Sequence, residues 1–95
     1  LTLKLGASGR ILTAFSGEEG EFYEEIRRKG FYISFGEHDP ETSSIAVPVY
    51  DASGQVVAAL NVSTHAGRVS RNELEQRFLP GLLGASRNLS AQLFA

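Results

Sequence analysis

The sequence contains no cysteine, so disulfides, thiol nucleophiles and zinc–thiolate sites are excluded. It has only two histidines, His38 and His65, which argues against a histidine-rich metal centre. No apolar run approaches the ~20 residues of a membrane-spanning helix, and no signal peptide is visible. Methionine is absent even at the first position, so we expect a fragment, a processed product or a chain from which segments are missing.

Charge of either sign is also sparse. The 95 residues are 42% hydrophobic and 21% charged, with a formal net charge of −2. These values predict one globular domain with a thin core, for which oligomerisation is a common supplement. Because no dense block of lysine and arginine occurs, this segment is not expected to bind nucleic acid by itself. We expect a cytoplasmic protein without membrane contact, metal or cofactor.

Residues 43–63 form the stretch around which the chain is organised, and they predict two strands joined by a tight turn. Residues 45–49 alternate between larger apolar and smaller side chains, which is the period of a half-buried strand. Asp51 and Gly54 occupy the first and fourth positions of a type I turn, where Asp and Gly are favoured. Residues 56–62 return as a nearly continuous apolar run, typical of a central strand.

Three residues of this hairpin depart from the apolar pattern. Pro48 has no N–H for a sheet ladder, so its side of the strand should be an edge or a bulge. Asn61 and Ser63 share a strand face with Val57 and Ala59, because side chains alternate. Buried polar groups are costly unless they are hydrogen-bonded. Asn61 and Ser63 therefore either bond backbone or face solvent, or they line a small-molecule pocket.

The first fifteen residues predict a short strand followed by a short helix. Residues 1–5 alternate apolar and polar, and Ser8 is a candidate N-cap for the short helix that follows it. Small residues at such a junction leave backbone N–H groups accessible, and a helix N-terminus favours anions. The junction is therefore either a tight packed turn or a site for a carboxylate or phosphate. The motifs of a P-loop or a dinucleotide site are lacking.

A second helix is predicted over residues 18–29. Ser16 and Glu19 have the spacing of a capping box, and Gly30 can end the helix. Glutamates crowd its start, and the basic triplet at 27–29 lies at its end. This arrangement complements the helix dipole, so the triplet is interpreted as helix-end chemistry and not as a phosphate-binding patch.

Residues 31–36 alternate as a strand should, with Phe31, Ile33 and Phe35 on one face. The loop at 37–42 carries three acidic residues and a histidine, a composition that suggests a metal or an acid–base pair. Adjacent loop residues rarely converge, however, and an Asp-Pro step is an ordinary turn signal, so a turn is favoured.

The last third of the chain predicts a long helix. Ser70 and Glu73 repeat the capping-box spacing, and residues 74–93 carry one broad apolar face. Pro80 should kink the helix or divide it near Leu79, because proline cannot donate to the carbonyl four residues earlier.

Several short motifs occur together in an order that resembles one protein family. They are ASGRIL at 7–12, GF at 30–31, GEH at 36–38, SSIAVPV at 43–49 and VAALNVS at 57–63. Together they resemble the C-terminal effector-binding domain of IclR-type bacterial transcription regulators, over nearly the whole chain. The closing motifs, GRVS at 67–70 and RFLP at 77–80, resemble the branch that senses aromatic acids such as protocatechuate and hydroxybenzoate.

The resemblance implies an α+β, GAF-like fold in which helices flank a curved antiparallel sheet. It also implies a pocket for a small organic acid, lined by polar residues of a helix start and of three strands. These residues are Ser8, Gly9, Ser34, Thr42, Ser44, Asn61 and Ser63. The helix start would donate N–H groups to a carboxylate, and the sheet would supply neutral donors on an otherwise apolar lining. Ser34 and Ser44 stand where relatives carry an acid and a thiol, and Asn61 where some carry serine, so the resemblance does not fix the ligand.

Two departures from the family concern the chain's extent. The family has a longer segment between its first helix and its Arg-rich helix, whereas Phe15 and Glu21 are nearly adjacent here. The family domain also begins upstream of Leu1 and follows a winged helix-turn-helix domain. We expect residues 1–95 to be part of an effector-binding domain, with the DNA-binding domain outside this chain. If a segment has been dropped after Phe15, the helix from Glu18 is not expected.

Three functions remain open. The leading hypothesis is a sensor and oligomerisation module, a homodimer or homotetramer, that acts on DNA only through the separate domain. The alternative is a GAF-like oligomerisation scaffold without a ligand, which the leucine-rich final helix favours. An enzyme is not expected, because no nucleophile elbow or spaced triad occurs.

Overall fold

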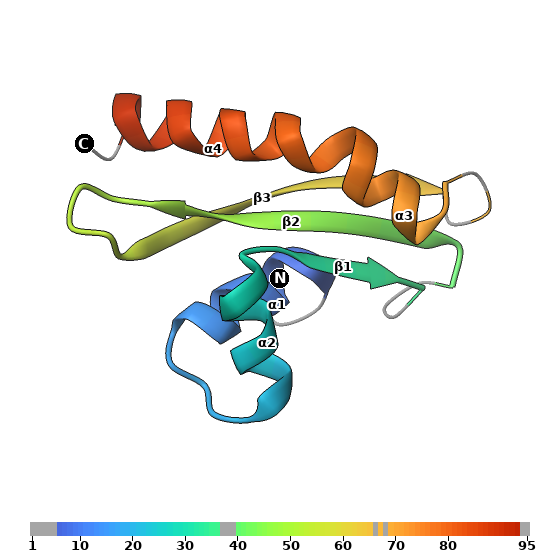
Figure 1. The fold of residues 1–95 in the computed structure, drawn as a ribbon, viewed down its shortest axis with the longest axis horizontal. Helices are drawn as coiled ribbons and strands as arrows, with labels where there is room; N and C mark the ends of the chain where they lie inside the picture. Colours follow the sequence, from blue (N-terminus) through green and yellow to red (C-terminus); the bar gives the residue numbers. More distant parts are fainter. Residues whose placement is uncertain (1–5, 37–39, 66, 68, 94–95) are drawn as a thin grey trace.

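The computed structural model describes residues 6–36, 40–65, 67 and 69–93. A three-stranded antiparallel sheet, in the order β1-β2-β3, lies between α4 on one face and α1 and α2 on the other (Figure 1). The elements are α1 (Gly6–Phe15), α2 (Glu21–Lys29), β1 (Tyr32–Phe35), β2 (Thr42–Tyr50), β3 (Val56–His65), α3 (Arg71–Glu73), η1 (Leu74–Phe78) and α4 (Leu79–Leu93). The predicted α+β class, with helices flanking an antiparallel sheet, is confirmed. The strand predicted for residues 1–5 lies outside the described residues.

The central strand is β2, which is buried from Ser43 to Val49. One of its faces packs on the α4 side, in a core of Ile33, Ile45, Val47, Leu74 and Leu82. The opposite face packs on the α1 side, in a core of Ala7, Ile11, Ala14, Ile26 and Ala46. Among the described residues β3 pairs only with β2, so the expected central place of residues 56–62 stays a prediction. None of these residues is fully buried, and Val57 is 43% exposed, so the apolar run is covered less than that of β2.

The turn between β2 and β3 forms as predicted. The Gly54 N–H donates to the Asp51 carbonyl at 3.1 Å, and Gly54 adopts a φ of 87°, which favours glycine. The Asp51 carboxylate accepts hydrogen bonds from the Ser53 N–H, the Ser53 hydroxyl and the Gln55 N–H. One side chain therefore organises the whole turn, and a bulge at Val49/Tyr50 directly precedes it.

Pro48 lies where β2 has a neighbouring strand on one side only, as its missing N–H predicts. It pairs with Ala59 of β3, whereas β1 stops at Tyr32, opposite Ala46. The Pro48 carbonyl instead accepts a hydrogen bond from the Ser86 hydroxyl of α4 at 2.6 Å. The Ser90 hydroxyl donates in the same way to the Tyr50 carbonyl at 2.5 Å. Each such bond contributes about 1 kcal/mol net, and together they join α4 to the open end of β2.

Two predicted helix starts are wrong. Ser8 lies inside α1, whose described residues begin at Gly6, so Ser8 is not an N-cap. The second helix begins at Glu21 after Gly20 and has no side-chain cap; the Ser16 hydroxyl donates instead to the Thr13 carbonyl at the end of α1. Ser16 lies between two helices, and a serine there can bond to the end of one helix as well as to the start of the next, so spacing alone misassigned it.

The predicted end of α2 is confirmed. Gly30 adopts a left-handed conformation with φ 80°, and its N–H donates to the Ile26 carbonyl at 2.8 Å. Arg27 reaches back from the last turn of α2 and donates to the carbonyls of Ala14 and Glu18, which ties the α1–α2 connection to the helix.

The C-terminal helix carries both predicted features. Ser70 Oγ accepts from the Glu73 N–H, and Glu73 Oε1 accepts from the Ser70 N–H, which completes the capping box. The irregularity expected near Leu79 is a π-helical turn, η1, that ends at Phe78. Pro80 has no N–H for the carbonyl four residues earlier, and a wider turn before it accommodates the proline ring.

The turn carboxylate predicts a pH dependence. The Ser53 hydroxyl first, then the Gln55 N–H, hold the pKa of Asp51 below its ordinary value. A lowered pKa stabilises the fold at pH above the ordinary carboxyl pKa, and the contribution is lost as pH falls through the lowered value. Asp51→Asn should therefore reduce the urea midpoint at neutral pH and converge with the unsubstituted chain in strong acid. A difference that stays constant with pH would contradict this role of the charge.

Candidate functional site

Three predicted site residues form a row across the sheet. Ser34 of β1 pairs with Ser44 of β2, and Ser44 pairs with Ser63 of β3. Directly opposed residues on neighbouring strands point to the same face. In the next row on that face, Ala46 is opposite both Tyr32 and Asn61. Because Ala46 packs against α1, the serine row and Asn61 lie on the face that α1 covers.

The direction of α1 brings its first turn toward the serine row. Phe15, at the end of α1, contacts Tyr50 with ring centroids 6.2 Å apart. Ala7, in the first turn, belongs to the same core cluster as Ala46, the next residue on this face after Ser44. The N-terminal turn therefore points to the Ser44 end of β2. The first N–H groups of a helix have no partners within the helix and are available to a ligand.

Ser34 and Ser44 of this row are buried residues, only 4% and 6% exposed. Within the described part of the chain, neither side chain makes a hydrogen bond. No described side-chain polar atom is sealed from solvent without a partner, so both hydroxyls keep some contact with solvent. Ser43, on the opposite face, differs because its hydroxyl bonds to the Thr64 hydroxyl at 2.9 Å.

The remaining predicted residues surround this row with different exposure. Ser8 is half-buried and Gly9 is buried in the first turns of α1, and Thr42 is half-buried at the start of β2. Asn61 and Ser63 are exposed; they lie on β3, which pairs on one side only among the residues described. The structure therefore assembles the five strand residues on one face, with α1 above it.

Sequence reasoning missed two charged or titratable neighbours. His65 is opposite Thr42 and follows Asn61 and Ser63 in the same alternation, so the period of two was sufficient to find it. Arg10, the one cation of α1, stacks on the Phe22 ring at 5.1 Å and contacts the Tyr23 hydroxyl at 3.5 Å. This contact between α1 and α2 depends on tertiary packing and had no signal in the sequence.

The described residues contain neither a metal-binding cluster nor a membrane-spanning helix. No group of three histidines or acidic residues in this part of the chain lies close enough to hold a metal ion. Residues 37–39, on which the weighed metal or acid–base site depended, lie outside the described residues. None of the helices described is long and apolar enough to cross a membrane.

The relatives reported below are named as transcription regulators. Residues 20–91 match the family described as "Bacterial transcriptional regulator IclR C-terminal". The "Pca regulon regulatory protein" of Pseudomonas putida is 62% identical over 71 residues, which are 75% of this chain and 24% of that protein. The "p-hydroxybenzoate hydroxylase transcriptional activator" of Acinetobacter baylyi is 33% identical over 69 residues, 73% of this chain and 26% of that protein. The chain thus spans only a minor part of the length of these relatives.

Solved structures share the fold. The C-terminal domain of the Escherichia coli transcriptional regulator KdgR superposes with a TM-score of 0.79 at 26% identity, covering 98% of this chain and 71% of that chain. The inducer-binding domain of the PobR transcription factor from Acinetobacter, in complex with 3-hydroxybenzoic acid, gives 0.81 at 24% identity, with 95% and 66% covered. These relatives are transcription regulators, so a non-enzymatic role is confirmed. The chain belongs to the IclR C-terminal family, the effector-binding domain of bacterial transcription regulators.

Proposed function

We propose that this chain senses a small aromatic carboxylic acid, which binds between the first turn of α1 and the serine row of the sheet. The observation that carries the proposal is that Ser34 and Ser44 are only 4% and 6% exposed, while their hydroxyls make no hydrogen bond and keep contact with solvent. Such hydroxyls are available to a ligand, and each hydrogen bond to it contributes about 1 kcal/mol net.

Each predicted residue has a role in this site. The first turn of α1, at Ser8 and Gly9, supplies backbone N–H groups to the carboxylate, where the helix dipole also favours negative charge. The hydroxyls of Ser34 and Ser44 bind the polar substituents of the ring. Asn61, Ser63 and Thr42 close the site at its open side.

The aromatic class is supported by the relatives. One relative is named as a p-hydroxybenzoate hydroxylase transcriptional activator. A domain of the same fold was solved in complex with 3-hydroxybenzoic acid. Apolar walls with a few convergent polar groups are typical of small-molecule sites. Tyr32 and Ala46 lie in the row next to the serines and offer such a wall.

In the whole regulator, residues 1–95 belong to the effector-binding domain of a cytoplasmic homodimer or homotetramer. A separate winged helix-turn-helix domain binds DNA. The acid changes operator binding only if its affinity differs between two arrangements of the subunits, because a ligand with equal affinity for both shifts no population.

The proposal predicts selective binding of aromatic acids. Calorimetry of the purified chain with benzoate, hydroxybenzoates, protocatechuate and pyruvate should give saturable heat for at least one aromatic acid. Ser34→Ala and Asn61→Leu should each weaken that affinity about tenfold, as expected for a lost hydrogen bond to a charged or polar ligand. No heat from any acid, with an unchanged oligomeric state in both variants, would favour the scaffold without a ligand.

Two adjacent serines separate affinity from stability. Ser44→Ala should weaken binding of the same acid and leave the free energy of unfolding unchanged or slightly raised, because its hydroxyl makes no bond in the free chain. Ser43→Ala should lower the free energy of unfolding by about 1 kcal/mol through loss of the Thr64 bond and leave affinity unchanged. Urea unfolding and calorimetry on both variants test this, and equal effects on affinity would refute the assignment of faces.

A further inference from the structure

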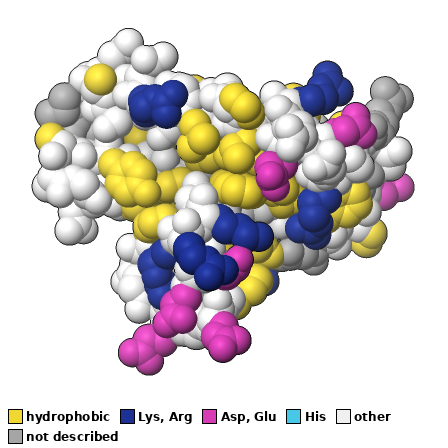
Figure 2. Space-filling view, in the orientation of Figure 1, with side chains coloured by type: hydrophobic (Ala, Val, Ile, Leu, Met, Phe, Trp, Pro, Cys, Tyr) yellow, Lys and Arg dark blue, Asp and Glu magenta, His cyan; other side chains and the backbone are white. Residues whose placement is uncertain are grey.

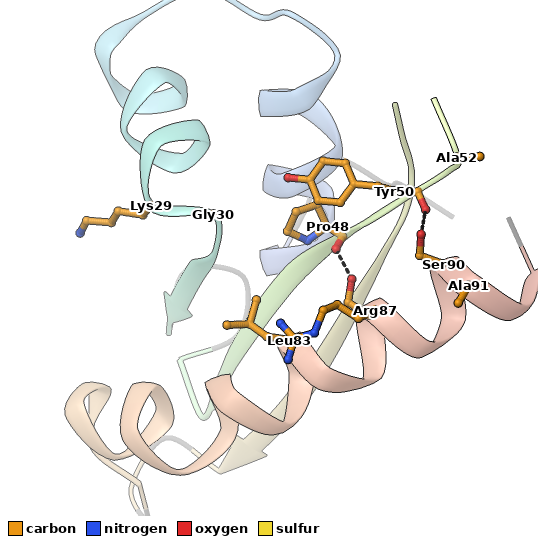
Figure 3. A pocket seen from close by; sticks show the side chains of 10 residues that line it. Lys29, Gly30, Pro48, Tyr50, Ala52, Leu83, Arg87, Ser90 and Ala91 are labelled. Carbon is orange, nitrogen blue, oxygen red and sulfur yellow. Dashed lines mark hydrogen bonds between the residues drawn. The ribbon is translucent and has the colours of Figure 1, made fainter. Parts of the chain in front are cut away.

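A cavity lies at the end of β2, whereas the serine row crosses the first part of that strand. It has a volume of about 490 Å³ and opens between the end of α2, the end of β2 and α4 (Figure 3). Its apolar lining includes Pro48, Tyr50 and Leu83. Tyr50 and Leu83 are 38% and 37% exposed, so their apolar surface is available to a ligand. None of the seven residues of the proposed acid site contributes to it.

The charged residues of this lining are all cations. Lys29 and Arg87 line the cavity, and no aspartate or glutamate does. By contrast, the cavity beside Phe22, of about 450 Å³, is lined by three glutamates as well as two cations. Figure 2 shows basic side chains above and below a band of hydrophobic ones between α4 and α2. In a chain with a net charge of −2, this cavity therefore favours an anion.

Both cations are available to a ligand. Arg87 makes no ion pair within the described residues, and in Figure 3 it reaches from α4, beside Leu83, toward the end of α2. Lys29 Nζ lies 3.6 Å from Glu25 Oε1, but Glu25 also binds Arg28, and all three side chains are substantially exposed. Exposed pairs of this kind hold their partners weakly.

The Ser86 and Ser90 hydroxyls at the cavity wall determine where the carboxylate of a ligand can lie. Ser86 and Ser90 donate their protons to the Pro48 and Tyr50 carbonyls, so their oxygens can only accept hydrogen bonds from a ligand. Acceptors repel a carboxylate, which leaves Lys29 and Arg87 as its partners. The apolar body of the ligand then lies on Pro48, Tyr50 and Leu83.

We propose that this cavity is a second binding site, separate from the acid site under α1, for a small organic anion with an apolar body. An arylalkanoate fits this description, with its carboxylate between Lys29 and Arg87. The site does not depend on the proposed function, because it shares no lining residue with the serine row.

Two-dimensional NMR of the purified chain, titrated with phenylacetate and with neutral phenylacetamide, tests the proposal. Phenylacetate should shift the amides of Gly30, Ala52 and Ala91, and phenylacetamide should bind more weakly.

Three variants test which residues hold the ligand. Arg87→Gln should weaken the affinity for phenylacetate, measured at these amides, by roughly three- to fivefold, which corresponds to the loss of one exposed charge pair. Arg77→Gln removes a cation outside the cavity and should have no effect. Ala91→Phe, at an exposed helix position on the cavity wall, should fill the space and abolish the shifts.

The titration distinguishes the two sites. Shifts confined to Ser44, Ser63 and their neighbours would overturn the second site and leave the proposed function intact. Shifts confined to the α2–α4 cavity would support the second site alone. Equal binding of phenylacetate and phenylacetamide, an Arg87→Gln affinity equal to that of Arg77→Gln, or no shifts at the cavity amides would overturn the proposal.

Discussion

The burial of β2 on both faces is the constraint on which the rest of this structure depends. A strand with apolar side chains on both faces needs a helix layer on each side. Here α4 covers Ile45 and Val47, and α1 covers Ala46. The side chains on the α1 face are smaller, which leaves room for polar groups beneath the helix. The residues of β2 therefore determine that larger side chains pack under α4 and smaller ones under α1.

Ser43 and Ser44, on opposite faces of β2, differ in the hydrogen bonding of their hydroxyls. Both are buried, and they are neighbours in sequence, but only Ser43 has a hydrogen-bond partner. A buried polar group with a partner stabilises the fold, whereas a hydroxyl without a partner that keeps contact with solvent adds little to stability. The Ser43 hydroxyl is therefore a structural contact, and the Ser44 hydroxyl on the α1 face is free to bond another group.

Local chemistry made some features predictable and tertiary packing decided the others. The Asp51 turn, the Gly30 helix end and the Ser70 capping box depend on residues a few positions apart, and the sequence predicts them correctly. Ser16 was misassigned because a serine between two helices can bond to either helix end, and Ser8 because α1 already includes Gly6 and Ala7. The alternation of Asn61 and Ser63 places both on the strand face that α1 covers. The cavity at Arg87 could not be predicted because it joins elements more than fifty residues apart.

The serines of α4 have one more effect, at the open end of β2. A strand edge with free N–H and carbonyl groups is a template for an added strand from another molecule, and so for aggregation. At this edge Pro48 offers no N–H, and Ser86 and Ser90 occupy the carbonyls of Pro48 and Tyr50. The same two hydroxyls that fasten the helix thus make this part of the central strand a poor seed for intermolecular sheets. An apolar strand can therefore end at the surface with fewer free backbone groups for another chain to pair with.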